Sequence, residues 1–161
     1  MERKRAFDPV VDAKTRLLIL GSLPGDASLK AAQYYAHPQN AFWRLVGGVI
    51  AQDLVVLPYV ERLDALKAAG IGLWDVIATA RRPGSLDGAI RDAEAADLRG
   101  LAASLPSLRA VAFNGATSAR IGRRSLDSAP GLALIDLPSS SPAYTRPFAE
   151  KAAAWAVLRA I

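Results

Sequence analysis

LLILGSLPGDASLKAAQYYAHPQNAFW, which occupies residues 17–43, is the stretch that most strongly indicates the fold of this chain. It begins with four consecutive apolar residues, and a continuous apolar run is typical of a parallel strand that is buried on both faces. A glycine- and proline-rich turn, GSLPG at 21–25, follows directly. Open α/β sheets bind their ligands at the carboxyl ends of strands, so this turn is a candidate binding loop.

Apolar runs and helical periodicity continue this pattern along the rest of the chain. We expect strands at 16–20, 71–77, 109–113 and 132–137, and helices at 42–51, 59–69, 92–103, 116–123 and 148–159. The segment 78–92 contains a Pro-Gly pair and many polar residues, so it is predicted to form a turn-rich connection. Alternating strands and helices predict an α/β fold, here a three-layer α/β/α sandwich in a single domain over residues 1–161.

Polar, turn-forming residues follow three of the predicted strands. They are GSLPG at 21–25, FNG at 113–115 and PSSSP at 138–142. In a parallel sheet these three strand ends lie at the same edge, so we expect them to converge on one cleft.

Composition limits the chemistry of such a cleft. The 161 residues include no cysteine and a single histidine, His37, which excludes iron–sulfur clusters, cysteine zinc sites and multi-histidine metal sites. No tight cluster of Asp and Glu suggests a magnesium site, so we expect neither a metal nor a cofactor. The net charge of +5 permits a polyanionic partner, and it is equally consistent with a solvated, arginine-rich surface.

The N-terminal segment is charged and has no apolar core, and no apolar run approaches the roughly 20 residues of a membrane span. We therefore expect a cytoplasmic protein that does not associate with membranes. We also expect it to act as a monomer.

Three common active-site motifs do not fit the first loop. It lacks the Gly-Lys-Ser/Thr of a phosphate-binding loop and the third glycine of the dinucleotide fingerprint. A triad of Ser22, His37 and Asp26 is disfavoured, because Ser22 does not lie in the Gly-x-Ser-x-Gly turn of serine hydrolases.

The segments GSLPGDASL, QYYAHPQNAFW, FNG and LPSSSPA occur in this order, and together they resemble the uracil-DNA glycosylase superfamily. Within it, the chain is most similar to the sixth family, the hypoxanthine-DNA (deoxyinosine) glycosylases. The resemblance covers nearly the whole chain; the long first motif is specific, whereas FNG and the serine-proline loop are individually weak. It implies a uracil-DNA glycosylase-like fold with a four-stranded parallel sheet. It also implies that water, without a metal, cleaves the N-glycosidic bond of a deaminated base flipped out of DNA, either hypoxanthine or uracil.

The resemblance makes Asn40 the candidate catalytic residue, which would position the attacking water. Many relatives have Asp or Asn close to the glycine of the first motif, where this chain has Ser22 and Leu23, so the Asn of the HPQN segment is expected to substitute for it. From the residues alone, Asn40 is also a good cap for the helix expected after it, worth about 1 kcal/mol. The two roles are compatible.

Further candidates would contact the base. Tyr35 is expected to stack on the flipped ring, with Tyr34 as the alternative, because adjacent side chains do not face one pocket. Asn114 can donate and accept together, which suits the N–H and C=O edge that hypoxanthine and uracil share, although Asn-Gly pairs are also common in plain turns. Ser22 and Leu23 would bring backbone N–H groups to the departing base.

The serine-proline loop, with Ser139, Ser140, Ser141 and Pro142, is predicted to contact DNA phosphates, as is Arg146. The plain alternatives are a strand-to-helix turn for the loop and a solvated surface position for the arginine.

Weaker candidates complete the predicted site. His37 contacts phosphate or base, or simply holds its loop, and Gly25 lets the backbone approach the ligand. Asp75 is interpreted first as a structural residue and second as a catalytic one. Arg81 and Arg82 are further candidates for phosphate contact.

Three other functions remain open from the sequence. They are a mismatch-type uracil-DNA glycosylase, a nucleic-acid-binding module without catalysis, and a small-molecule hydrolase acting through Ser22.

Overall fold

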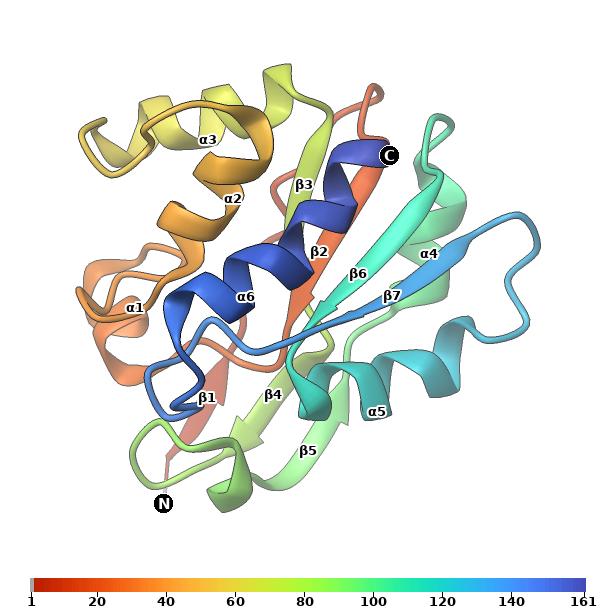
Figure 1. The fold of residues 1–161 in the computed structure, drawn as a ribbon. Helices are drawn as coiled ribbons and strands as arrows, with labels where there is room; N and C mark the ends of the chain where they lie inside the picture. The colour runs from red at the N-terminus through yellow and green to blue at the C-terminus, as the bar shows by residue number, and fades with distance from the viewer. Residues whose placement is uncertain (1) are drawn as a thin grey trace.

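A parallel sheet of four strands, in the order β3-β2-β6-β7, forms the centre of the computed structural model, which describes residues 2–161 (Figure 1). Its strands are β2 (Leu17–Gly21), β3 (Ile71–Asp75), β6 (Ala110–Asn114) and β7 (Ala133–Leu137). All three neighbouring pairs are parallel, which confirms the predicted sheet.

Helices cover both faces of this sheet, which gives the predicted α/β/α sandwich (Figure 1). One face carries α2 (Phe42–Ile50), α3 (Tyr59–Ala68) and α6 (Phe148–Trp155), which continues as the 3₁₀ turn η2 (Ala156–Ala160). The other face carries α4 (Leu98–Ser104) and α5 (Ala116–Leu126).

Strand β2 is apolar throughout because its alternate side chains enter two different cores. Leu17 and Ile19 pack in the core that includes Phe42 and Trp155, from α2 and α6. Leu18 and Leu20 pack in the opposite core, with residues of α4 and α5.

A second, antiparallel sheet in the order β1-β4-β5 was not predicted. It consists of β1 (Arg3–Arg5), β4 (Ile77–Arg81) and β5 (Arg91–Ala95). The run 71–77, predicted as one strand, is divided at Val76, so that β3 ends in the large sheet and β4 begins in the small one. The small sheet therefore lies beyond the carboxyl end of β3 (Figure 1).

The segment 78–103 accounts for the remaining errors. The predicted connection at 78–92 contains most of β4 and the 3₁₀ turn η1 (Asp87–Ala89), and the predicted helix at 92–103 contains most of β5 before α4 begins. Every residue of β5 is exposed, so no alternation of apolar residues marks it as a strand, and its conformation comes from pairing with β4. The short helix α1 (Asp26–Ala31), inside the first loop, was also not predicted.

None of the helices in residues 2–161 combines the length and the hydropathy that crossing a bilayer requires.

Candidate functional site

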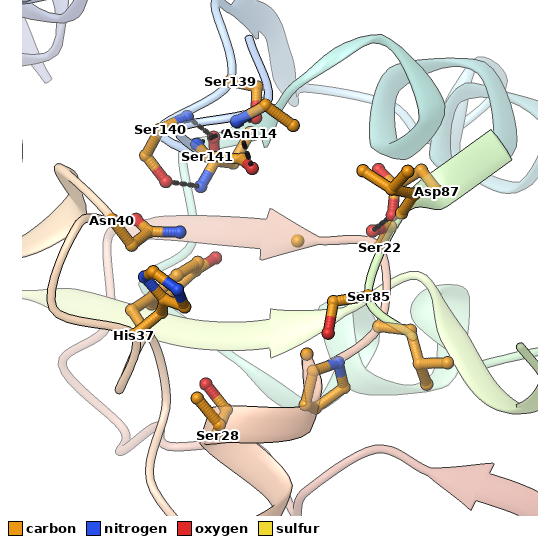
Figure 2. A pocket seen from close by; sticks show the side chains of 18 of the residues that line it. Ser22, Ser28, His37, Asn40, Ser85, Asp87, Asn114, Ser139, Ser140 and Ser141 are labelled. Carbon is orange, nitrogen blue, oxygen red and sulfur yellow. Dashed lines mark hydrogen bonds between the residues drawn. The ribbon is translucent and has the colours of Figure 1, made fainter. Parts of the chain in front are cut away.

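A pocket of about 600 Å³ opens at the carboxyl edge of the parallel sheet. The loops after β2, β6 and β7 all line it, as predicted, and the end of β3 and the loop after β4 line it as well. Figure 2 shows Asn40, Asn114 and the serine loop along one side of the space, with Ser22 and Asp87 on the other.

The amide of Asn40 is oriented by the start of α2. Its Oδ1 accepts a hydrogen bond from Phe42 N at 3.0 Å, which satisfies one of the free N–H groups of the helix. Since that partner is a donor, the oxygen and nitrogen ends of the amide are assigned, and the nitrogen end is directed into the pocket (Figure 2). The next residue, Ala41, donates its N–H to Ser140 O at 3.0 Å, so this segment is tied to the serine loop. The capping role is therefore present, and the nitrogen end remains available to a ligand.

Tyr35 has one face of its ring packed within the protein. The ring stacks on Phe42, with centroids 3.9 Å apart and planes inclined by 14°. Its backbone adopts φ +53°, a left-handed conformation, and its carbonyl accepts from the Trp43 indole N–H. No hydrogen bond of good geometry reaches the buried hydroxyl. Burial, followed by the nearby Asp75 carboxyl, raises the pKa of Tyr35 above the usual range, and the neighbouring Asn114 side chain opposes this rise.

Tyr34, the alternative stacking residue, belongs to the core. Its ring meets Phe7 edge-on, and its hydroxyl donates to Asp8 O at 3.1 Å. Both tyrosines nevertheless line the pocket, contrary to the expectation for adjacent side chains, although Tyr34 is only 4% exposed.

Asn114 joins the end of β6 to the serine loop. Its Oδ1 accepts from Ser140 N and its Nδ2 donates to Ser140 Oγ, both at 2.9 Å (Figure 2). Each end of a side-chain amide can form two hydrogen bonds, so one donor and one acceptor position remain for a ligand. The side chain is 9% exposed and lines the pocket.

Asp75 lies at the end of β3, on the floor of the pocket, with 3% of its surface exposed. Its Oδ2 has no hydrogen-bond partner. Burial, with a smaller contribution from Asp87, raises the pKa of this carboxyl to about 7, against a lowering effect of Arg82.

Gly21 leaves room for the polar groups of this floor. A Cβ at this position would lie 2.6 Å from Asp75 Oδ1 and 2.9 Å from the Tyr35 hydroxyl oxygen, closer than real Cβ atoms approach. Gly25 is less constrained, because its nearest contact would be Ser85 Oγ at 3.3 Å.

A buried arginine, Arg82, holds together the side of the pocket opposite Asn40, here called the rim, which is formed by the first loop at Pro24 and the loop after β4 at Gly84 and Asp87. Arg82 is 1% exposed and donates to Pro24 O and Gly84 O, with Asp87 Oδ1 at 3.7 Å. It therefore points inward, and the prediction that it contacts phosphate is wrong. Burial lowers its pKa, which the neighbouring carboxylates oppose.

The partners of Ser22, Asp26 and His37 rule out a catalytic triad of these three residues. Ser22 Oγ donates to Asp87 Oδ1 at 2.6 Å, and Asp26 pairs with Lys4. His37, which is exposed on the pocket wall, accepts from Gln39 N at its Nδ1, so it holds its own loop.

The serine loop is ordered by local hydrogen bonds. Ser139 Oγ accepts from Ser141 N, Ser141 Oγ accepts from Ala143 N, and Lys151 Nζ donates to Ser141 O. Ser140 is buried, whereas Pro142 is exposed at the mouth of the pocket.

Arg146 is exposed outside the pocket lining and pairs with Glu150 at 3.2 Å. Leu23, 6% exposed, contributes an apolar part of the lining.

Several lining residues were not predicted: Ser28, Ser85, Leu86, Asp87 as a partner of Ser22, and Tyr144. Most lie in the loop after β4, and the only sequence signal for that loop is its Pro-Gly turn. Within residues 2–161, no group of three or more His, Asp or Glu side chains is placed to hold a metal ion.

Comparisons with known proteins cover nearly the whole chain. Residues 9–159 match the sequence model of the uracil DNA glycosylase superfamily. A hypoxanthine DNA glycosylase from Methanosarcina barkeri is 43% identical over 154 residues, 96% of each chain. Another from Methanosarcina acetivorans is 44% identical over 143 residues, 89% of each chain. A solution NMR structure of a Methanosarcina acetivorans protein, provisionally described as a uracil DNA glycosylase, has a TM-score of 0.87 at 40% identity and covers 98% of this chain and 97% of that one.

Proposed function

The chain belongs to the uracil DNA glycosylase superfamily, and we propose that it hydrolyses the bond between hypoxanthine and deoxyribose in DNA and leaves an abasic site. The observation that carries this proposal is that Tyr35 and Asn40, from the loop before α2, and Asn114, from the end of β6, line one pocket large enough for a flipped nucleobase. Two hypoxanthine DNA glycosylases resemble this chain over at least 89% of its length, which supports hypoxanthine as the base.

The bound base would lie against the ring of Tyr35. One face of that ring is occupied by Phe42, so the face that remains toward the pocket is the one available for stacking. Base–aromatic stacking contributes about 1–3 kcal/mol, enough to offset much of the cost of flipping the nucleotide out of the helix.

Asn40 would hold the attacking water. Its Oδ1 is committed to Phe42 N, so the orientation of the amide is fixed before the substrate arrives. The amide N–H groups that remain can donate to the water oxygen and place it against the sugar carbon. Such preorganised positioning lowers the barrier without a strongly basic residue, because the sugar develops positive charge as the base departs.

The serine loop is suited to contact the DNA backbone next to the flipped nucleotide. Ser141 and Pro142 lie at the mouth of the pocket, and the loop is held in place by Asn114 and Lys151. Hydroxyl and backbone N–H groups bind phosphate without reading sequence.

A panel of oligonucleotides tests this function. Single- and double-stranded DNA with one hypoxanthine, uracil or xanthine is incubated with excess protein, and alkali-labile breaks are counted. We expect cleavage at hypoxanthine, and faster cleavage of uracil would favour a mismatch-type uracil-DNA glycosylase instead. Salt-dependent binding without any abasic product would identify a non-catalytic binding module.

A further inference from the structure

Two buried polar atoms without partners lie on the floor of the pocket. They are Asp75 Oδ2 and the Tyr35 hydroxyl, and they are the unpaired buried side-chain polar atoms found within residues 2–161. Folded proteins pair roughly nine in ten buried polar groups. Two exceptions at the bottom of one pocket indicate that a polar edge of a ligand completes their hydrogen bonding.

The backbone keeps the space between these groups open. Gly21, opposite Asp75 in the register of β2 and β3, has both the carboxyl and the phenol hydroxyl against its Cα. Since no side chain can occupy this position, the carboxyl stays at the surface of the pocket floor while only 3% exposed.

The groups that face Asp75 favour its neutral form. Tyr34 and Tyr35 approach it from the first loop, Asp87 from η1, and Arg82 from the end of β4. The guanidinium of Arg82 is already engaged with two carbonyls and Asp87, and within residues 2–161 no cationic side chain forms an ion pair with the Asp75 carboxyl. Burial and the Asp87 charge therefore dominate, and the pKa of Asp75 rises to about 7.

We propose that Asp75 reads the flipped base: its neutral carboxyl donates O–H to the base carbonyl and accepts the adjacent ring N–H. This inference rests on the proposed glycosylase function. Hypoxanthine presents such an edge as N1–H and O6, and uracil presents it as N3–H and its neighbouring carbonyl oxygen. As the bond to the sugar breaks, its electron pair enters the base and charge accumulates on that carbonyl oxygen, where the Asp75 hydroxyl stabilises it. No proton needs to be transferred, since the hydrogen bond alone strengthens in the transition state.

Asn114 has fewer free hydrogen-bonding positions than Asp75 with which to recognise the base. One donor and one acceptor position of its amide are committed to Ser140. Asp75 has no such partner, so its carboxyl offers a donor and an acceptor in one plane.

The test is the pH dependence of kcat/KM for deoxyinosine DNA, measured for the parent protein, Asp75→Asn and Asp75→Ala. Because the protonated form is active, the parent activity should level off about one pH unit below 7, be half-maximal near pH 7 and fall up to tenfold per unit at higher pH. Asp75→Asn presents the same donor and acceptor without ionising, so it should stay within about threefold of the parent at pH 6 and keep its activity at pH 8. Asp75→Ala should lose about 100-fold.

Controls separate this role from others. His37→Gln removes the histidine that lines the pocket, and the fall above pH 7 should persist in this variant. Melting curves show whether each variant is folded. The pH profile of the parent protein tests the proposal even if a variant fails to fold.

Three results would overturn the proposal: parent activity that rises through pH 7, Asp75→Asn as inactive as Asp75→Ala, or Asp75→Ala as active as the parent. Binding of DNA that carries a cleavage-resistant 2′-fluoro-deoxyinosine separates the two hypotheses. If the parent binds it with this pH dependence but cleaves nothing, base reading by Asp75 stands and the glycosylase function fails. If the parent cleaves deoxyinosine without this dependence, the function stands and the role of Asp75 fails.

Discussion

The two ends of the Asn40 amide face different surroundings. The oxygen accepts from the first N–H of α2, and the nitrogen points into the pocket. From the sequence, helix capping and water positioning are two interpretations of one residue. The structure makes them compatible, because each uses a different atom of the side chain.

Substitution of Asn40 separates these uses. Asn40→Asp retains an acceptor for Phe42 N but loses the amide N–H groups, so its melting temperature should match the parent while cleavage of deoxyinosine DNA falls at least about 100-fold. Asn40→Ala should lose the same activity and also about 1 kcal/mol of unfolding free energy. Single-turnover cleavage and denaturant unfolding measure the two effects. A folded Asn40→Asp protein that cleaves at the parent rate would remove Asn40 from the chemistry.

Which residues reach the pocket was partly predictable. The motifs predict Asn40, Tyr35 and Asn114 as site residues, and all three line the pocket. The inward orientation of Arg82 was not predictable, because its neighbour Arg81 has the same sequence surroundings and is exposed. Burial of a charge depends on tertiary partners, here the carbonyls of Pro24 and Gly84.

The strand ends explain why distant segments meet. Three strands of the parallel sheet, β2, β3 and β6, end at Gly21, Asp75 and Asn114, and the serine loop follows the end of β7. All four positions therefore lie at the carboxyl edge of one sheet. Their convergence could be predicted from the order of strands and helices alone. The position of the loop at 84–89 could not be predicted in this way. This loop connects β4 and β5, which pair in the second sheet, and β5 has no alternating apolar pattern that would mark it as a strand.

Arg82 links this loop to the first loop, and its removal should loosen both. Arg82→Met leaves the carbonyls of Pro24 and Gly84 without their donor, so we expect a loss of about 2–4 kcal/mol of unfolding free energy. Arg81→Met is the matched control: its exposed ion pair with Asp92 should contribute less than about 1 kcal/mol. Urea unfolding of the two variants measures the difference. Equal losses would mean that Arg82 does not hold the rim.

The protein as a whole carries a formal charge of +5, which suits a polyanionic substrate without identifying one. The salt dependence of DNA binding shows which cationic side chains contact phosphate. Each such contact releases a counterion from the DNA and so adds to the slope of log K against log salt concentration.

Arg146→Ala should reduce this slope by about 1, because Arg146 is exposed and follows the serine loop. Arg124→Ala is the control with the same charge change: Arg124 lies in the last turn of α5, roughly 12 Å along the helix from its first residue, Ala116, which is the end nearer the pocket residue Asn114. Fluorescence anisotropy at several salt concentrations gives both slopes. A slope that falls equally in both variants would indicate a general effect of charge instead of a contact by Arg146.

Release of the free base from DNA is the most direct measurement of what this molecule does. A duplex with one deoxyinosine is incubated with excess protein, and a duplex with deoxyadenosine at the same position is the control; the supernatant is then analysed by chromatography. We predict one equivalent of free hypoxanthine per duplex and an alkali-labile site at that position, with no adenine released from the control. An intact deoxyinosine strand, with no free hypoxanthine after prolonged incubation with the folded protein, would contradict this function.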